Sequence, residues 1–347
     1  MKLILVETGN GERSVSVEYI PVTLNAIRAD TIVGCDLYLQ NCINNGIRYV
    51  LYCSGTSIVK SDKIEELHEH QIKKLFIRKE DKKIYLKYVE SSLKHIINDD
   101  RVNIKEKAQI VYDVAKNIVV DLFEDPRSGE QVERSKDWVS NTIDFIIKSK
   151  DSFSGMMSMI SYDYYTYTHS VNVAVLGLLF AKYLGFDGSE MQSFGTGMLL
   201  HDVGKTQIDP DIINKKERLN DEEFAKVKMH VDLGADIIKQ TGCVDSASFI
   251  PIMQHHERDN GKGYPNGLRG DAIHKYGKIA GIIDTYDALT TKRSYADAKK
   301  PFSALKIMYD EMKGGFDEKY FKDFILFLGS GGERQYQKRK NIIPVSV

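Results

Sequence analysis

A helical periodicity that runs from about residue 91 to about residue 328 constrains the fold of this chain more than any other feature. Apolar residues recur there at three- and four-residue spacing, most regularly over residues 104–123 and 134–147. Residues 125–129 (Asp-Pro-Arg-Ser-Gly) are turn-forming types and separate these two stretches. The pattern predicts an all-α bundle for the larger part of the chain.

The first 90 residues follow a different pattern, in which β-branched and aromatic residues dominate short segments. This composition predicts strands over residues 14–20, 31–39, 48–52 and 82–88. The Asn-Asn-Gly sequence at residues 44–46 is typical of a hairpin turn. One helix is expected over residues 61–70, with Ser61 as its N-cap.

The expected fold class is therefore α+β overall. A small, mixed, strand-rich N-terminal domain (residues 1–90) would precede an all-helical domain (residues 91–347). Because no chemistry-bearing motif occurs before residue 90, we interpret the first domain as a regulatory or sensory domain of unknown ligand. Through this domain the protein would also form a homodimer or bind a signalling-protein partner.

Composition excludes several classes of protein. A formal net charge of -1 gives no electrostatic reason to expect binding to a nucleic acid polymer. The apolar run after Met1 is too short for a signal peptide, and residues 171–186 are too short and too interrupted to cross a membrane. The four cysteines form no CxxC pair. We expect a cytoplasmic protein with reduced thiols and no membrane insertion.

Histidines occupy unusual positions on the predicted helices. The stretch 221–241 begins with a capping box formed by Asn220 and Glu223 and ends at Gly242. Its apolar face includes Phe224 and Val227, and His230 follows Val227 by three residues. His230 should therefore point into the interior. A single histidine of this kind is most often a hydrogen-bonded core residue, so His230 alone would carry little weight.

The same placement recurs on several helices, and this changes the interpretation. Burying many ionisable groups separately is costly, because each group needs its own partner. Bound cations remove that cost for all of them together, since they hold neutral imidazoles and ionised carboxylates. The candidate metal ligands are His169, His201, Asp202, His230, His255, His256 and Asp284.

The donor types narrow the choice of metal. Five imidazoles and two carboxylates exceed the needs of one ion, and they suit two ions that share a carboxylate. With nitrogen and oxygen donors and no cysteine, two divalent ions of iron or manganese are favoured, while zinc, nickel and cobalt remain open. Paired divalent ions are typical of phosphoryl chemistry.

At this point five motifs, in order and spacing, resemble the HD-GYP family over residues 151–316. The motifs are the segments 201–205 (His-Asp-Val-Gly-Lys), 255–257 (His-His-Glu), 261–265 (Gly-Lys-Gly-Tyr-Pro), 266–270 (Asn-Gly-Leu-Arg-Gly) and 284–290 (Asp-Thr-Tyr-Asp-Ala-Leu-Thr). The resemblance implies a helical metal phosphodiesterase that hydrolyses the bacterial messenger cyclic di-GMP to pGpG, with a hydroxide that bridges the metals as nucleophile.

The resemblance also assigns roles to individual residues. It implies the seven ligands given above, with Asp202 as the bridge and as a catalytic residue. Lys205 would contact the scissile phosphate. The substrate would also be bound by Gly263, Tyr264 and Pro265 of the Gly-Tyr-Pro loop, where Tyr264 could stack on a guanine, and by Arg293. Asp287, three residues after Asp284, is interpreted as a carboxylate that supports a ligand from behind.

Two departures from the family pattern matter. Members with a third ion have a glutamate four residues before the first histidine, where this chain has Tyr165. We therefore expect two ions and pGpG as the main product, with weak onward cleavage to GMP. Many relatives have Arg-Pro-Tyr followed by a basic residue, where this chain has Arg293, Ser294, Tyr295 and Ala296.

Three alternatives stay open at this level. The substrate could be a related cyclic dinucleotide such as cyclic GMP-AMP. The helical domain could be a catalytically weak cyclic-di-GMP-binding signalling module. The wider HD superfamily also includes di-iron oxygenases, against which the Gly-Tyr-Pro loop and Lys205 argue.

Overall fold

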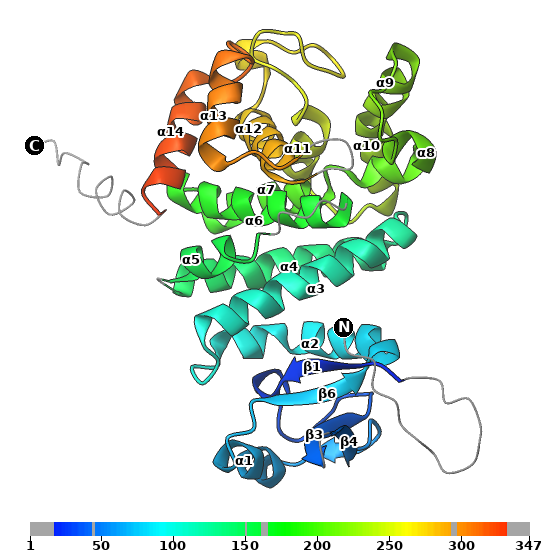
Figure 1. The fold of residues 1–347 in the computed structure, drawn as a ribbon. Coiled ribbons are helices and arrows are strands. Elements are labelled where there is room, and N and C mark those ends of the chain that lie inside the picture. The colour runs from blue at the N-terminus through cyan, green and yellow to red at the C-terminus, as the bar shows by residue number, and fades with distance from the viewer. Residues whose placement is uncertain (1–16, 44–45, 150, 161–165, 293–296, 332–347) are drawn as a thin grey trace, which may run out of the picture. The chain divides into compact units, whose positions relative to one another are not determined.

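The structure is a computed structural model, which describes residues 17–43, 46–149, 151–160, 166–292 and 297–331 (Figure 1). The chain divides into two compact units, Met1–Val114 and Ala115–Val347. The division falls within helix α3 (Ile104–Glu124).

The first unit contains a four-stranded antiparallel sheet with the order β1-β6-β3-β4. Its strands are β1 (Tyr19–Thr23), β6 (Lys74–Arg78), β3 (Leu37–Ile43) and β4 (Gly46–Cys53). A two-stranded ribbon joins β2 (Thr31–Ile32) to β5 (Ile58–Val59), and two helices follow, α1 (Ser61–Glu69) and α2 (Lys82–Asn98). Strands β3 and β4 pair antiparallel with Ile43 opposite Gly46, which confirms the predicted hairpin.

Several local predictions for this unit were wrong. Residues 31–39 were predicted as one strand, but they divide between β2 and β3, which lie in different sheets. Residues 82–88 were predicted as a strand, but they begin α2. Over its full length α2 buries Tyr85, Val89 and Leu93, which are four residues apart, and this longer period outweighs alternation in a seven-residue window. Strand β6 was not predicted. The N-cap of α1 is Lys60, and Ser61 is the first helical residue.

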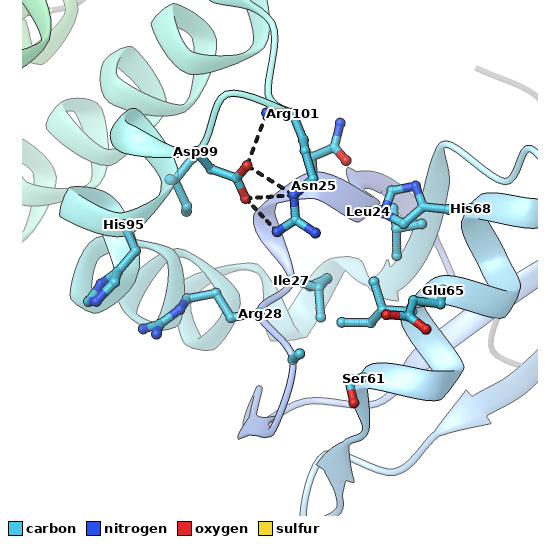
Figure 2. A pocket seen from close by; sticks show the side chains of 13 residues that line it. Leu24, Asn25, Ile27, Arg28, Ser61, Glu65, His68, His95, Asp99 and Arg101 are labelled. Atoms are coloured by element: carbon cyan, nitrogen blue, oxygen red, sulfur yellow. Dashed lines mark hydrogen bonds and ion pairs between the residues drawn. The ribbon is translucent and has the colours of Figure 1, made fainter. Parts of the chain in front are cut away.

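A pocket of about 430 Å³ opens on the first unit (Figure 2). Its apolar floor is formed by Leu24, Ile27, Ile64 and Ile96, all of which are buried. Charged and polar side chains surround this floor, and among them Arg101 donates to Asp99 at 2.7 Å. The other polar lining residues include Arg28, Glu65, His68 and His95.

The second unit is helical throughout its described part. After the end of α3 it contains α4 (Gly129–Lys148), α5 (Ser152–Met157), α6 (Thr166–Leu184), α7 (Gly188–Leu200), η3 (Val203–Gln207), α8 (Pro210–Ile213), α9 (Asp221–Lys228), α10 (His230–Thr241), α11 (Phe249–Gln254), α12 (Lys275–Thr290), α13 (Pro301–Asp310) and α14 (Glu318–Gly329). Helices α6 and α12 are buried along most of their length. Phe180 of α6 packs against Phe324 and Phe327 of α14. The α+β fold class is confirmed.

The predicted helix 221–241 is two helices rather than one. Helix α9 ends at Lys228 and α10 begins at His230, with Met229 as the shared cap residue. The capping box of Asn220 and Glu223 and the left-handed Gly242 are both present as predicted. Phe224, which was predicted on the buried face, does not join the core, and its exposed fraction is 46%. None of the described helices is long and apolar enough to cross a membrane.

Candidate metal centre

Seven side chains that lie far apart in the sequence converge inside the second unit. His169 lies on α6, His230 begins α10 and Asp284 lies on α12. The other four follow directly after α7 or α11: His201, Asp202, His255 and His256. All of them are buried except His256, whose side chain is 18% exposed.

The ligand atoms form two adjoining groups. One consists of His169, His201 and Asp202, and the other of His230, His255 and His256; within each group the ligand atoms lie within 4.8 Å of one another. The groups touch, since Nε2 of His230 lies 3.3 Å from Nε2 of His255 and the rings of His201 and His255 are 4.8 Å apart.

The carboxylates of Asp202 and Asp284 each lie close to imidazoles of both groups. Asp202 Oδ2 lies 3.6 Å from His169 Nε2 and 3.5 Å from His201 Nε2. The other oxygen of Asp202, Oδ1, lies 3.5 Å from His230 Nε2. Asp284 has a similar position, with Oδ1 at 3.1 Å from His169 Nε2 and Oδ2 at 3.7 Å from His256 Nδ1.

Backbone carbonyls fix the orientation of three imidazoles. Nδ1 of His201 lies 2.7 Å from the carbonyl oxygen of Met198. Nδ1 of His230 lies 2.6 Å from that of Val227, and Nδ1 of His255 lies 2.9 Å from that of Ile252. A carbonyl oxygen only accepts, so Nδ1 must carry the proton and donate. The lone pair of each ring is therefore on Nε2, the atom that faces the centre. This is the arrangement of metal-binding histidines.

His169 is oriented by a carboxylate instead. Its Nδ1 donates to Asp287 Oδ2 at 2.7 Å, and Asn172 Nδ2 donates to Asp287 Oδ1 at 3.0 Å. Both oxygens of the buried Asp287 are thus occupied, and Asp287 lies at the Nδ1 edge of the His169 ring, while Asp284 lies at the Nε2 edge.

The electrostatic environment sets protonation states that suit cation binding. Burial lowers the pKa of each of the histidines His201, His230, His255 and His256, to about 4 for His230. Burial alone would raise the pKa of Asp202, but Lys205 and the surrounding imidazoles hold it well below its usual value. The imidazoles are therefore neutral and the carboxylate ionised at neutral pH, as metal ligands must be.

Two buried atoms show that the donor set fits divalent ions. His201 Nε2 and Asp202 Oδ1 are buried and have no hydrogen-bond partner among the described residues. A buried acceptor without a donor is costly, and a bound cation would satisfy both atoms. Lys205 Nζ donates to Asp202 Oδ2 and thereby keeps a fixed positive charge beside the centre.

Gly204 brings the His201–Asp202 turn against α10. A Cβ at this position would lie 1.9 Å from His230 O and 2.5 Å from Gly234 N. Only glycine permits this approach. The glycine of the His-Asp-Val-Gly-Lys segment is therefore required by the contact between η3 and α10, which sets the distance between the two ligand groups.

The Gly-Tyr-Pro loop lies beside His256. A Cβ on Gly263 would lie 2.4 Å from Arg258 N, so the loop also depends on close backbone approach, and Gly261, Gly267 and Gly270 have positive φ as expected. The Tyr264 ring lies 4.5 Å from the His256 ring at an interplanar angle of 33°. The Tyr264–Pro265 peptide bond is cis.

Sequence reasoning assigned no role to Glu257 or Arg258, although both lie in or next to the His-His-Glu segment. The buried Glu257 carboxylate accepts from Asn266 N and Leu268 N, each at 2.8 Å. Arg258 donates to the carbonyl of His255 at 3.0 Å. These contacts connect the loop to the ligands. Tyr165, Arg293, Ser294, Tyr295 and Ala296 lie outside the described residues.

Comparison with known proteins agrees with this geometry. Residues 145–320, which include all seven converging side chains, match the HD domain family. The chain belongs to the HD domain family. Over 234 residues it is 30% identical to the cyclic di-GMP phosphodiesterase PA4108 of Pseudomonas aeruginosa, and the match covers 66% of this chain and 56% of that relative. This confirms the resemblance to HD-GYP proteins that the motifs indicated.

A second relative has a different named substrate. The chain is 37% identical over 134 residues to the 3'3'-cGAMP-specific phosphodiesterase 2 of Vibrio cholerae, covering 38% of this chain and 26% of the relative. The chain thus spans about half the length of the first relative and about a quarter of the second.

One solved structure has a similar fold. Bd1817, an HDG"Y"P protein from Bdellovibrio bacteriovorus, aligns with a TM-score of 0.63 at 22% sequence identity, over 90% of this chain and 100% of that chain. At this identity the likeness concerns the fold alone.

Proposed function

We propose that this protein hydrolyses one phosphodiester bond of a cyclic dinucleotide. The substrate that we favour is cyclic di-GMP, which would give the linear product pGpG. The position of Asp202 carries the proposal, because its two oxygens face different histidine groups. A carboxylate so placed is suited to bridge two ions, and paired ions are suited to phosphodiester hydrolysis. The HD domain relatives named as cyclic dinucleotide phosphodiesterases support the choice of substrate.

The proposed metal content is two divalent ions, iron or manganese. The ligands would be His169, His201, Asp202, His230, His255, His256 and Asp284. When bound, such ions supply Lewis acidity to phosphate oxygens and a hydroxide nucleophile at neutral pH.

The protein's own side chains would bind the substrate and stabilise the charge that develops in the reaction. Lys205, fixed by its bond to Asp202, would neutralise charge that develops on the scissile phosphate. Tyr264 would stack on a guanine, Gly263 and Pro265 would shape the loop around it, and Arg293 would contact the substrate. In the reaction a hydroxyl group adds to phosphorus, the bond to a ribose 3′ oxygen breaks, and that oxygen takes up a proton.

The decisive experiment combines metal analysis of anaerobically purified protein with product analysis on cyclic di-GMP. Two equivalents of iron or manganese and accumulation of pGpG are the expected results. The variant Asp202→Ala should lose metal and turnover together. If it kept full metal content and full turnover, the bridging role would be disproved. Wild-type protein that binds cyclic di-GMP tightly without product would instead be a signalling module.

Cyclic GMP-AMP is a second candidate substrate, since one relative is named for it. Turnover of both cyclic dinucleotides by the same preparation separates the candidates. A kcat/KM for cyclic GMP-AMP above that for cyclic di-GMP would make cyclic GMP-AMP the preferred substrate.

We also propose that residues 1–90 form a regulatory domain. The pocket of about 430 Å³ supports this, because most of its lining lies within these residues and is completed by His95, Ile96, Asp99 and Arg101. An apolar floor with a few charged groups is typical of small-molecule sites. The variant Ala29→Trp narrows the pocket at an exposed lining residue. A protein-free cell extract should change the turnover of the wild type but not of the variant. An identical response of both proteins would contradict the proposal.

A further inference from the structure

Helix α9 presents an aromatic ring and a lysine next to Tyr264 of the Gly-Tyr-Pro loop. Phe224 of this helix lies outside the core, and its ring is 6.3 Å from the Tyr264 ring. Met229 is 53% exposed. Phe224 and Met229 thus leave apolar surface exposed on α9 and at its end.

Lys228 places its ammonium group near both rings. Its Nζ is 5.2 Å from the centroid of Phe224 and 6.0 Å from the centroid of Tyr264. Lys228 forms no salt bridge within the described part of the chain, whereas Lys215, near the start of α9, is paired with Glu223. An ammonium group held over aromatic faces without a carboxylate can accept an anionic group of a ligand.

The position of this lysine relative to the metal centre limits what it can bind. Tyr264 connects the two places, since its ring is 4.5 Å from the His256 ring and 6.5 Å from the His230 ring. The lysine nearest to the centre, Lys205, is already bonded to Asp202. Lys228 is therefore a cation distinct from Lys205, and it lies beside Tyr264. A cyclic dinucleotide carries a second phosphate and two bases that extend away from the scissile bond.

We propose that Lys228 binds the second, non-scissile phosphate of the cyclic dinucleotide and that Phe224 stacks against one of its bases. This inference rests on the proposed phosphodiesterase function and extends it. Helix α9 would then be the wall of the site that distinguishes a cyclic dinucleotide from a simple phosphodiester. Base stacking on an aromatic side chain and one phosphate contact each contribute enough for about a ten-fold change in affinity.

The test compares two substrates. Cyclic di-GMP has both phosphates and both bases, whereas bis(p-nitrophenyl) phosphate has a single phosphodiester. The variants Lys228→Gln and Phe224→Ala should each raise the ratio of KM for cyclic di-GMP to KM for the small diester about ten-fold. Phe224→Tyr should restore the ratio, because the ring remains. Lys226→Gln, an exposed lysine on the same helix, is the matched control and should leave the ratio unchanged.

Three outcomes distinguish the role of α9 from the phosphodiesterase function on which it rests. Active wild type with an unchanged ratio in Lys228→Gln and Phe224→Ala would overturn the role of α9 and leave the phosphodiesterase proposal intact. Equal losses on both substrates would indicate a structural role and would also overturn the inference. Wild type that hydrolyses the small diester but no cyclic dinucleotide would overturn both proposals.

Discussion

His169 Nδ1 donates to Asp287 Oδ2 at 2.7 Å, and through this bond α12 orients a ligand that lies on α6. The same helix provides Asp284, whose Oδ1 lies 3.1 Å from His169 Nε2. The two carboxylates of α12 thus contact opposite nitrogens of one imidazole. One carboxylate fixes the ring and the other faces the metal centre with it.

Replacing the supporting carboxylate should weaken metal binding without removing a ligand. In Asp287→Asn the amide keeps the size of the side chain but accepts more weakly from His169 Nδ1. We expect metal affinity to fall about 10- to 100-fold, as is usual when such a partner is lost. Titration against a competing chelator measures this. Asp236→Asn, at an exposed position of α10, should have no effect, and an equal loss there would contradict the role of Asp287.

A methyl group at Gly204 should separate η3 from α10. Because its Cβ would overlap His230 O, the variant Gly204→Ala must move the His201–Asp202 turn. Overpacking of this kind costs about 1–3 kcal/mol, and the melting temperature should fall by about 3–10 °C. The sole tryptophan, the buried Trp138, reports melting of the second unit by fluorescence.

Metal content measured on the same Gly204→Ala sample should also fall, because the distance between the ligand groups changes. Gly188→Ala is the control, since an added Cβ there meets nothing within 4 Å. Unchanged melting and metal content in Gly204→Ala would show that the turn adapts without cost.

Removal of the Glu257 carboxylate should loosen the Gly-Tyr-Pro loop. In Glu257→Ala the N–H groups of Asn266 and Leu268 lose their acceptor. Hydrogen bonds to charged groups contribute about 1.5–3 kcal/mol each, so local opening should become at least about ten-fold more frequent. Trypsin cleavage after Lys262 or Arg269 measures this opening. Glu222→Ala, exposed on α9, should be cleaved there at the wild-type rate.

An ion pair at the start of α14 should make the stability of the second unit depend on pH. Lys278 Nζ donates to Asp317 Oδ2 at 2.9 Å. Burial alone would raise the pKa of Asp317, but the bond from Lys278 and the N–H groups of Lys319 and Tyr320 lower it below its usual value. A lowered folded-state pKa contributes stability above the unfolded-state pKa of about 3.9, and this stability is lost as pH falls through the folded value.

Asp317→Asn keeps a good N-cap residue but removes the charge. At pH 7 it should be destabilised by about 1–2 kcal/mol, and the difference should shrink progressively as pH falls from about 3.9 towards the lowered folded-state pKa. A smaller difference in stability at pH 3 than at pH 7 is therefore expected. Urea unfolding followed by Trp138 fluorescence at both pH values measures this. Asp310→Asn breaks the exposed pair with Lys306 and should change stability by less than about 0.5 kcal/mol. A pH-independent difference for Asp317→Asn would exclude the ion pair as its cause.

The sequence by itself determined which residues are candidates for the metal centre. A histidine such as His230 on an apolar face has to point inward, and this follows from local periodicity. The cap residues Asn220, Glu223 and Gly242 were also predictable, because capping depends on backbone groups within a few residues.

Other features were decided only by the tertiary structure. Phe224 lies outside the core and near the Tyr264 ring, although the helical period places it on the apolar face. The position of Asp202 between two histidine groups depends on the contact between η3 and α10 at Gly204. Periodicity specifies the face of a helix that is buried, but not the helix that packs on it. For this reason the sequence determined the set of candidate ligands, and the packing of the helices decided how they are arranged.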